Sequence, residues 1–207
     1  VVSGVALRGW CRTCGAPIAA FHPLVEALVP ALSVLAWVEM GWSWQLGVVL
    51  WLIPVGLAVS VIDLRTFMVP TRVVWPAFGV AVVLAVIGAL VESEPRWLWA
   101  ALVGLAVAAG PLAVIWFALP TAMGFGDVRL AVLAGWTVGF ATAGDLRGAA
   151  TLAVVVLALA AVIGLVLGIA VLGARGRKAK VPFGPAILIA AFVCSVYAPG
   201  ILDGLGI

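Results

Sequence analysis

The sequence predicts an all-α membrane protein, a polytopic bundle of about seven transmembrane helices with its N-terminus in the cytoplasm. Of its 207 residues, 66% are hydrophobic and only 9% are charged, and the mean hydropathy is +1.34. Soluble domains contain roughly 45–50% apolar and about 25% charged residues, so the composition excludes a soluble globular enzyme. Strands of a membrane barrel would alternate apolar and polar residues, whereas this chain contains long runs of Ala, Val and Leu.

Seven apolar stretches account for the predicted spans, since a helix needs about 20 apolar residues to cross roughly 30 Å of hydrocarbon. The fifth stretch is shorter than the rest, so we expect neighbouring helices to shield it. We expect 1–22 to form a short cytoplasmic segment and 23–207 to form one membrane-embedded domain. The spans are expected at about 23–41, 44–62, 73–91, 98–119, 128–143, 149–172 and 183–200.

The connections between these stretches predict the orientation, because Lys and Arg gather on the cytoplasmic side of membrane proteins. Only Arg96 and Arg147 fall in connections on the side that is expected to face outward. The sequence therefore predicts a multi-pass protein of the inner (cytoplasmic) membrane, surrounded by lipid, with its C-terminus outside. The Lys and Arg residues on the opposite, cytoplasmic side are Arg8, Arg12, Arg65, Arg72, Arg129, Arg175, Arg177, Lys178 and Lys180.

Two aspartates stand out because carboxylates at membrane depth are costly and often functional. Asp63 ends the second apolar stretch and Asp127 precedes the fifth, so both are expected at the cytoplasmic face. A structural alternative is that each aspartate caps a helix and is neutralised by Arg65 or Arg129. Glu26, just inside the first stretch, is expected to pair with an arginine or a backbone donor.

The residues before Asp127 are Gly124-Phe125-Gly126, a sequence that lets the backbone turn sharply and lets another segment approach closely. Two carboxylates held together can hydrolyse a peptide bond, because like charges at short range do not both ionise. The ionised group then takes a proton from water while the protonated group polarises the carbonyl. The pair therefore indicates hydrolysis by a carboxylate dyad.

Four motifs in order resemble those of prepilin peptidases, the type IV leader peptidases. Asp63 with Pro70 seven positions later is similar to the first active-site motif, and Gly124-Phe125-Gly126-Asp127 resembles the Gly-x-Gly-Asp motif of membrane aspartyl proteases. The stretch from Cys11 to Glu26 resembles the cytoplasmic segment before the family's core. Val181-Pro182-Phe183-Gly184-Pro185 is similar to the motif that opens its last helix.

The resemblance implies an aspartic endopeptidase that cleaves the basic leader from pilin-like precursors at the cytoplasmic membrane face. It implies Asp63 and Asp127 as the catalytic pair, and an active-site loop that contains Pro70, Gly124, Gly126 and Arg129. Two positions depart from the family pattern. Arg129 stands where Lys is common, and Thr71 stands where Asp or Asn commonly follows the motif proline.

Cys11 and Cys14 form a single Cys-x-x-Cys, whereas longer family members carry two such pairs. One pair supplies only half of a tetrahedral zinc site, so Cys11 and Cys14 are either a metal-binding pair or a structural pair. We expect the structural role and no bound metal. Because the four-cysteine region is associated with N-methylation in the larger members, we expect neither methyltransferase activity nor a cofactor here. No nucleic-acid partner is expected either.

Two other functions are compatible with the composition. A small proton-coupled transporter could use the inner-face aspartates, but transporters usually place an ionisable group near the bilayer middle, often within structural repeats. A structural membrane subunit without chemistry would leave the paired motifs unexplained. The sequence favours the protease.

Overall fold

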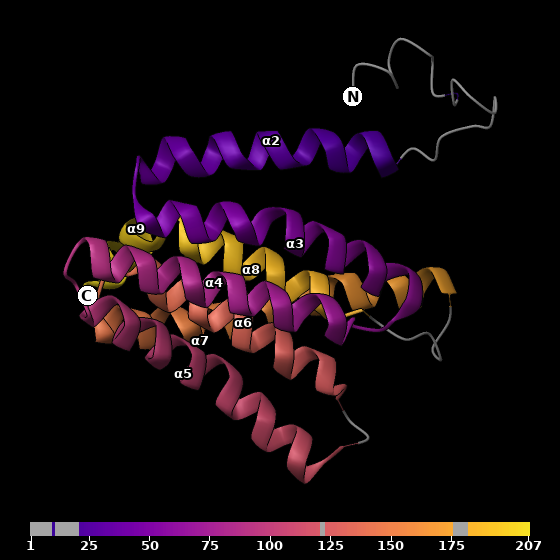
Figure 1. Cartoon of the computed structure of the whole chain (residues 1–207). Helices are drawn as coiled ribbons and strands as arrows, with labels where there is room; N and C mark the ends of the chain where they lie inside the picture. Colours follow the sequence, from indigo (N-terminus) through magenta and orange to yellow (C-terminus); the bar gives the residue numbers. More distant parts are fainter. Residues whose placement is uncertain (1–9, 11–20, 121–122, 176–181) are drawn as a thin grey trace.

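The computed structural model describes residues 10, 21–120, 123–175 and 182–207, and the regular elements in these ranges are α-helices (Figure 1). Their bounds are α2 Phe21–Met40, α3 Trp44–Thr66, α4 Thr71–Val91, α5 Arg96–Ala118, α6 Phe125–Ala141, α7 Leu146–Arg175, α8 Gly184–Val196 and α9 Ala198–Leu205. A helix occupies each of the seven predicted ranges. The predicted all-α bundle is thus confirmed.

Among the described residues, five helices are individually long and apolar enough to cross a membrane, and the bent pair α8–α9 would make a sixth. These five are α2, α3, α4, α5 and α7. The chain is therefore a multi-pass membrane protein. The helix on the fifth predicted span, α6, has 17 residues and most of them are buried, which agrees with the expected shielding by neighbours.

The last predicted span differs from the expectation of one continuous helix over 183–200. It consists of α8 and α9, whose axes meet at 80°. Pro199 stands in the first turn of α9. Proline lacks a backbone N–H and clashes with the carbonyl four residues earlier, so it begins a helix more easily than it continues one. The break was not predicted because the whole stretch is apolar and its composition does not indicate where a helix ends.

The α5 and α6 backbones are in direct contact because small residues line both facing surfaces. A Cβ atom added to Gly104 of α5 would lie 2.8 Å from the Gly139 Cα, and one added to Gly135 of α6 would lie 2.8 Å from the Leu105 Cα. Such small-residue seams let membrane helices approach closely enough for extensive van der Waals contact. The seam fixes the position of α6, and α6 carries Asp127 in its first turn.

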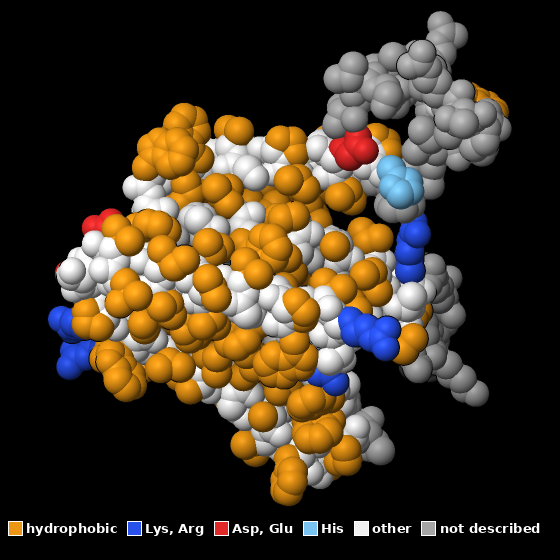
Figure 2. Space-filling model, in the orientation of Figure 1, with side chains coloured by type: hydrophobic (Ala, Val, Ile, Leu, Met, Phe, Trp, Pro, Cys, Tyr) orange, Lys and Arg blue, Asp and Glu red, His pale blue; other side chains and the backbone are white. Residues whose placement is uncertain are grey.

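Charged side chains gather at the two ends of the bundle, and apolar side chains cover the surface between them (Figure 2). Arg65 lies in the last turn of α3 and Arg72 follows the start of α4, at the end where Asp127 begins α6. Arg96 and Arg147 begin α5 and α7 at the opposite end. This separation is the arrangement that the charge pattern predicts for a membrane-spanning protein.

We expect reporter fusions to confirm the orientation. Fusions at residues 95, 146 and 207 should report the outside of the membrane, and fusions near 67 and 178 should report the cytoplasm, because positive charge is retained inside. Paired alkaline phosphatase and fluorescent-protein reporters would measure both compartments. A cytoplasmic signal at 207 would contradict the predicted number of crossings.

Candidate active site

Asp63 lies in the last turn of α3 and is buried, with 4% of its surface exposed. The helix ends because Phe67 adopts a left-handed conformation (φ 53°) and donates its backbone N–H to the Asp63 carbonyl at 2.8 Å. Pro70 then begins α4 as its N-cap residue. Pro70 is therefore a helix-starting residue and is not among the described residues that line the pocket around Asp63.

Asp127 is the third residue of α6, and its backbone N–H bonds the Gly124 carbonyl at 3.1 Å. Gly126 allows the segment after Asp63 to reach this helix start, because a Cβ at Gly126 would lie 2.7 Å from the Val69 Cβ. The close approach expected of a glycine is thus found at Gly126. At Gly124 the backbone is in the ordinary extended region and a Cβ would have 3.7 Å of clearance, so no steric need for glycine is visible there.

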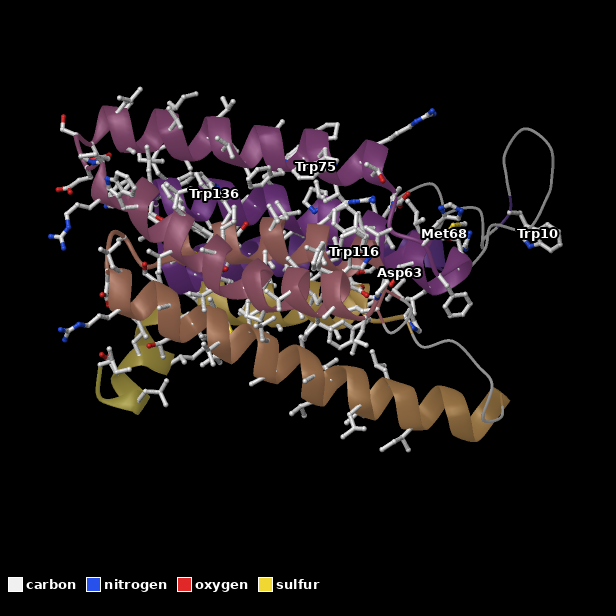
Figure 3. All side chains as sticks on the ribbon, turned by 90° about the horizontal axis from the view of Figure 1, so that it is seen from below. Trp10, Asp63, Met68, Trp75, Trp116 and Trp136 are labelled. Carbon is white, nitrogen blue, oxygen red and sulfur yellow. The ribbon has the colours of Figure 1, made fainter. Side chains whose placement is uncertain are left out.

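Both aspartates line one pocket of about 970 Å³. Asp63 and Asp127 are near enough for an electrostatic interaction between their carboxyl groups. Figure 3 shows Asp63, Met68 and Trp116 toward the same end of the bundle, away from Trp136. The described lining residues are Asp63, Phe67, Met68, Val69, Ile115, Pro120, Met123, Gly124, Phe125, Gly126, Asp127, Arg129, Pro182 and Phe183.

The start of α8 forms a further wall of this pocket. The Gly184 backbone N–H donates to Oδ2 of Asp63 at 3.1 Å, and this bond joins residues 121 positions apart in the chain. A Cβ at Gly184 would lie only 2.6 Å from that same oxygen. The sequence motif Pro182-Phe183-Gly184-Pro185 was identified by its similarity to the motif that opens the family's last helix, but its contact with Asp63 was not predicted.

Arg129 lines the pocket without forming an ion pair with either aspartate among the described residues. Its guanidinium lies 4.6 Å from the ring centroid of Phe125, and its Nη1 donates to Oγ1 of Thr71. The structural alternative in which Arg129 neutralises Asp127 through a direct ion pair is therefore not seen among the described residues. The two positions that depart from the family pattern, Arg129 and Thr71, contact each other.

Cys11 and Cys14 lie outside the described residues. In the part of the chain that the structure describes, no three or more His, Cys, Asp or Glu residues come together as metal ligands would. Cys194 is fully buried within α8, as expected for a small apolar residue that fills space in the bundle.

Comparison with known proteins agrees with these motifs. Residues 50–169 match the model of the type IV leader peptidase family, and residues 1–40 match the Bacterial Peptidase A24 N-terminal domain. The first match contains both Asp63 and Asp127.

Curated relatives carry the name prepilin leader peptidase/N-methyltransferase. The protein from Stutzerimonas stutzeri is 35% identical, with 95% of this chain and 65% of the relative aligned. Those from Xanthomonas campestris pv. campestris and Aeromonas hydrophila are each 30% identical, over 98% and 97% of this chain and 68% and 67% of the relatives. The chain thus spans about two thirds of the length of these relatives. No solved structure matches it. With a family match over more than half of its length and relatives aligned along nearly all of it, this chain belongs to the type IV leader peptidase family.

Proposed function

We propose that this protein is an aspartic endopeptidase that removes the basic leader from type IV prepilin-like precursors. The observation that carries the proposal is the placement of Asp63 and Asp127, from two helix ends, on the walls of one pocket. The relatives' names supply the class of substrate. The orientation expected from the charged residues would put this pocket at the cytoplasmic face of the inner membrane.

The proposed reaction needs one proton on the pair of carboxyl groups. The ionised carboxylate takes a proton from a water molecule while the water oxygen attacks the carbonyl carbon of the scissile peptide bond. The protonated carboxyl group donates its proton to the carbonyl oxygen, giving a neutral tetrahedral diol. Collapse of the diol breaks the C–N bond and re-forms the C=O bond. The leaving nitrogen takes a proton from the protonated carboxyl group, while one diol hydroxyl gives its proton to the ionised carboxylate, which restores the single proton on the dyad. The products are the free leader and a mature protein with a new amino terminus.

The pocket also carries apolar side chains, among them Phe67, Ile115 and Phe183. A prepilin-like substrate combines a basic leader with an apolar helix, and cleavage at their junction would leave that helix in the membrane. The position of both acids at one end of the bundle supports cleavage at the membrane face. It gives no support to a proton-relay transporter, which would need ionisable groups near the bilayer middle.

The test is cleavage of a purified prepilin-like precursor by the full chain in detergent, read as a mobility shift. Mass spectrometry of the product would locate the cut between the leader and the apolar helix. A full chain that is folded, by size exclusion and thermal melting, yet leaves such precursors intact would contradict the proposed function.

We further propose that the predicted segment 1–22 is dispensable for cleavage chemistry. A Cys11→Ser/Cys14→Ser double variant should keep most of its peptidase activity, because the proposed reaction uses only carboxylates and water. The product should also lack the mass of an added methyl group when S-adenosylmethionine is supplied. Initial rates, normalised to the amount of membrane-inserted protein, would measure the first effect. Complete loss of cleavage at normal abundance, or stoichiometric zinc in the purified protein, would contradict this view.

A further inference from the structure

The two carboxyl groups of the pocket differ in their hydrogen bonds. Oδ2 of Asp63 accepts the Gly184 backbone N–H at 3.1 Å in a buried environment. No described residue donates a hydrogen bond to the Asp127 side chain. Its Oδ2 atom lies beside Gly124, and a Cβ atom added to Gly124 would be 3.7 Å from that oxygen. The hydrogen-bonding environments of Asp63 and Asp127 therefore differ, although the proposed reaction alone does not distinguish the two residues.

A backbone N–H can only donate, so it stabilises an unprotonated carboxylate oxygen more than a protonated one. Gly184 is also the first residue of the 13-residue helix α8, and a helix N-terminus favours a negative charge placed against it. Both effects act on Asp63, where they counteract the cost of burying an ionised carboxylate. They favour the form of the dyad in which Asp63 is ionised and the proton resides on Asp127.

The donor is held in place by neighbours on two other helices. The Phe183 ring fits against Gly164 of α7, where an added Cβ would lie 2.7 Å from the ring's Cδ2. On α6, the Cδ1 methyl of Leu130 would lie 3.0 Å from a Cβ at Gly184. Because these contacts fix the start of α8, the direction of the Gly184 N–H is set before any substrate arrives.

The charged groups around Asp63 do not oppose this assignment. Asp127 and Arg129, both from α6, line the pocket with Asp63. Helix α8 contributes no charged side chain, and α4 brings Arg72 to this end of the bundle. Helix α2 brings His22 and Glu26 in its first turns. An ionised Asp63 with a neutral Asp127 leaves one negative charge in the pocket, so the two carboxyl groups do not repel each other.

We propose that Asp63 is the general base and Asp127 the general acid, and that Gly184 is the positioning residue that assigns these roles. This inference rests on the proposed peptidase function. In the attack step, Asp63 takes the proton from water and Asp127 gives its proton to the carbonyl oxygen. The electron pair of the water oxygen forms the new C–O bond, and the carbonyl π pair moves onto the oxygen that Asp127 protonates.

The pH dependence of kcat/KM tests the assignment, because each limb of the profile reports a different ionisation. The acidic limb reports the first ionisation of the dyad and the alkaline limb reports the second. Removing a hydrogen bond to Asp63 changes only the step in which Asp63 ionises. If Asp63 is the base, the acidic limb moves and the alkaline limb stays. If Asp63 is the acid, the reverse holds.

Two variants weaken this hydrogen bond in the full chain. Gly184→Ala adds a Cβ atom only 2.6 Å from Oδ2 of Asp63. The carboxylate must therefore rotate away from the Gly184 N–H. A semisynthetic protein with an ester in place of the Phe183–Gly184 amide removes the donor without adding bulk. The control is Gly56→Ala, which adds the same methyl group between α3 and α8 but at 3.7 Å from its nearest neighbour, Leu188.

We expect the acidic limb to move to higher pH by about one to two units in both variants, with the alkaline limb and the Gly56→Ala profile unchanged. A shift of the alkaline limb alone would reverse the two roles. Two unchanged limbs in either active variant would overturn the positioning role of Gly184. If Gly184→Ala fails to fold, the pH profile of the ester-containing protein alone tests the positioning role of Gly184. Failure of the peptidase function itself would appear differently, as an unmodified protein that does not cleave.

Discussion

Asp63→Asn and Asp127→Asn are each expected to lower the rate of precursor cleavage by about 10³-fold or more. Asparagine has nearly the shape of aspartic acid but can neither accept the proton from water nor supply one to the carbonyl. The double variant should be no slower than either single variant, because removing one member of a cooperating pair already removes the function of both. Single-turnover cleavage of a purified precursor in detergent would measure all three.

Asp203→Asn and Asp145→Asn are the matched controls, because Asp203 lies in α9 and Asp145 precedes α7, at the end of the bundle opposite the pocket. Both controls should cleave at close to the original rate. Two aspartates that merely cap helices would instead give modest and additive losses of stability. A stable Asp63→Asn or Asp127→Asn protein that cleaves at near-normal rate would eliminate the dyad.

Gly139→Val is expected to cause a large loss of stability, because Gly139 belongs to the small-residue seam between α5 and α6. An added Cβ would lie 2.9 Å from the Ala101 Cα and 3.0 Å from the Ala100 carbonyl carbon. These are backbone atoms of α5, so no side chain can rotate to make room, and the helices must separate. Overpacking of this kind costs about 1–3 kcal/mol, and the loss of the seam adds to it. Size exclusion after heating would record the lowered melting temperature.

Gly79→Val is the control for this substitution, because Gly79 lies in α4 with nothing within 4 Å of an added Cβ. It should change the melting temperature by much less than Gly139→Val. Equal effects from the two substitutions would show that glycine itself, through helix propensity or flexibility, matters more than the contact between α5 and α6.

The helices themselves could be predicted from the sequence because most apolar runs are long enough to cross the hydrocarbon core, and residues that favour helix starts bound some of them. Ser43 caps α3 by accepting the Leu46 N–H at 3.1 Å, and Pro70 begins α4. The break before Pro199 was missed since hydropathy averages over a window and is insensitive to a single missing N–H. Composition thus predicts where a helix can lie more reliably than where it bends.

The candidate site could be predicted only in part. Asp63 and Asp127 were identifiable because a carboxylate next to an apolar run is conspicuous. The role of Gly184 was not, because nothing in a one-dimensional sequence relates a backbone N–H to a side chain 121 residues away. The contact of Arg129 with Thr71 could not be predicted for a similar reason, since the two residues are 58 positions apart and become neighbours only in the folded chain.

The contact between Arg129 and Thr71 has a consequence for the design of chimaeras. Each residue belongs to a different motif, one after Pro70 and one after Asp127, yet the hydrogen bond makes them a single unit. A graft that imports either motif alone from a relative with a different residue would separate a guanidinium from its acceptor beside the two carboxyl groups. Motif swaps in this family should therefore exchange both segments together, and a graft of one motif can fail even when both aspartates are intact.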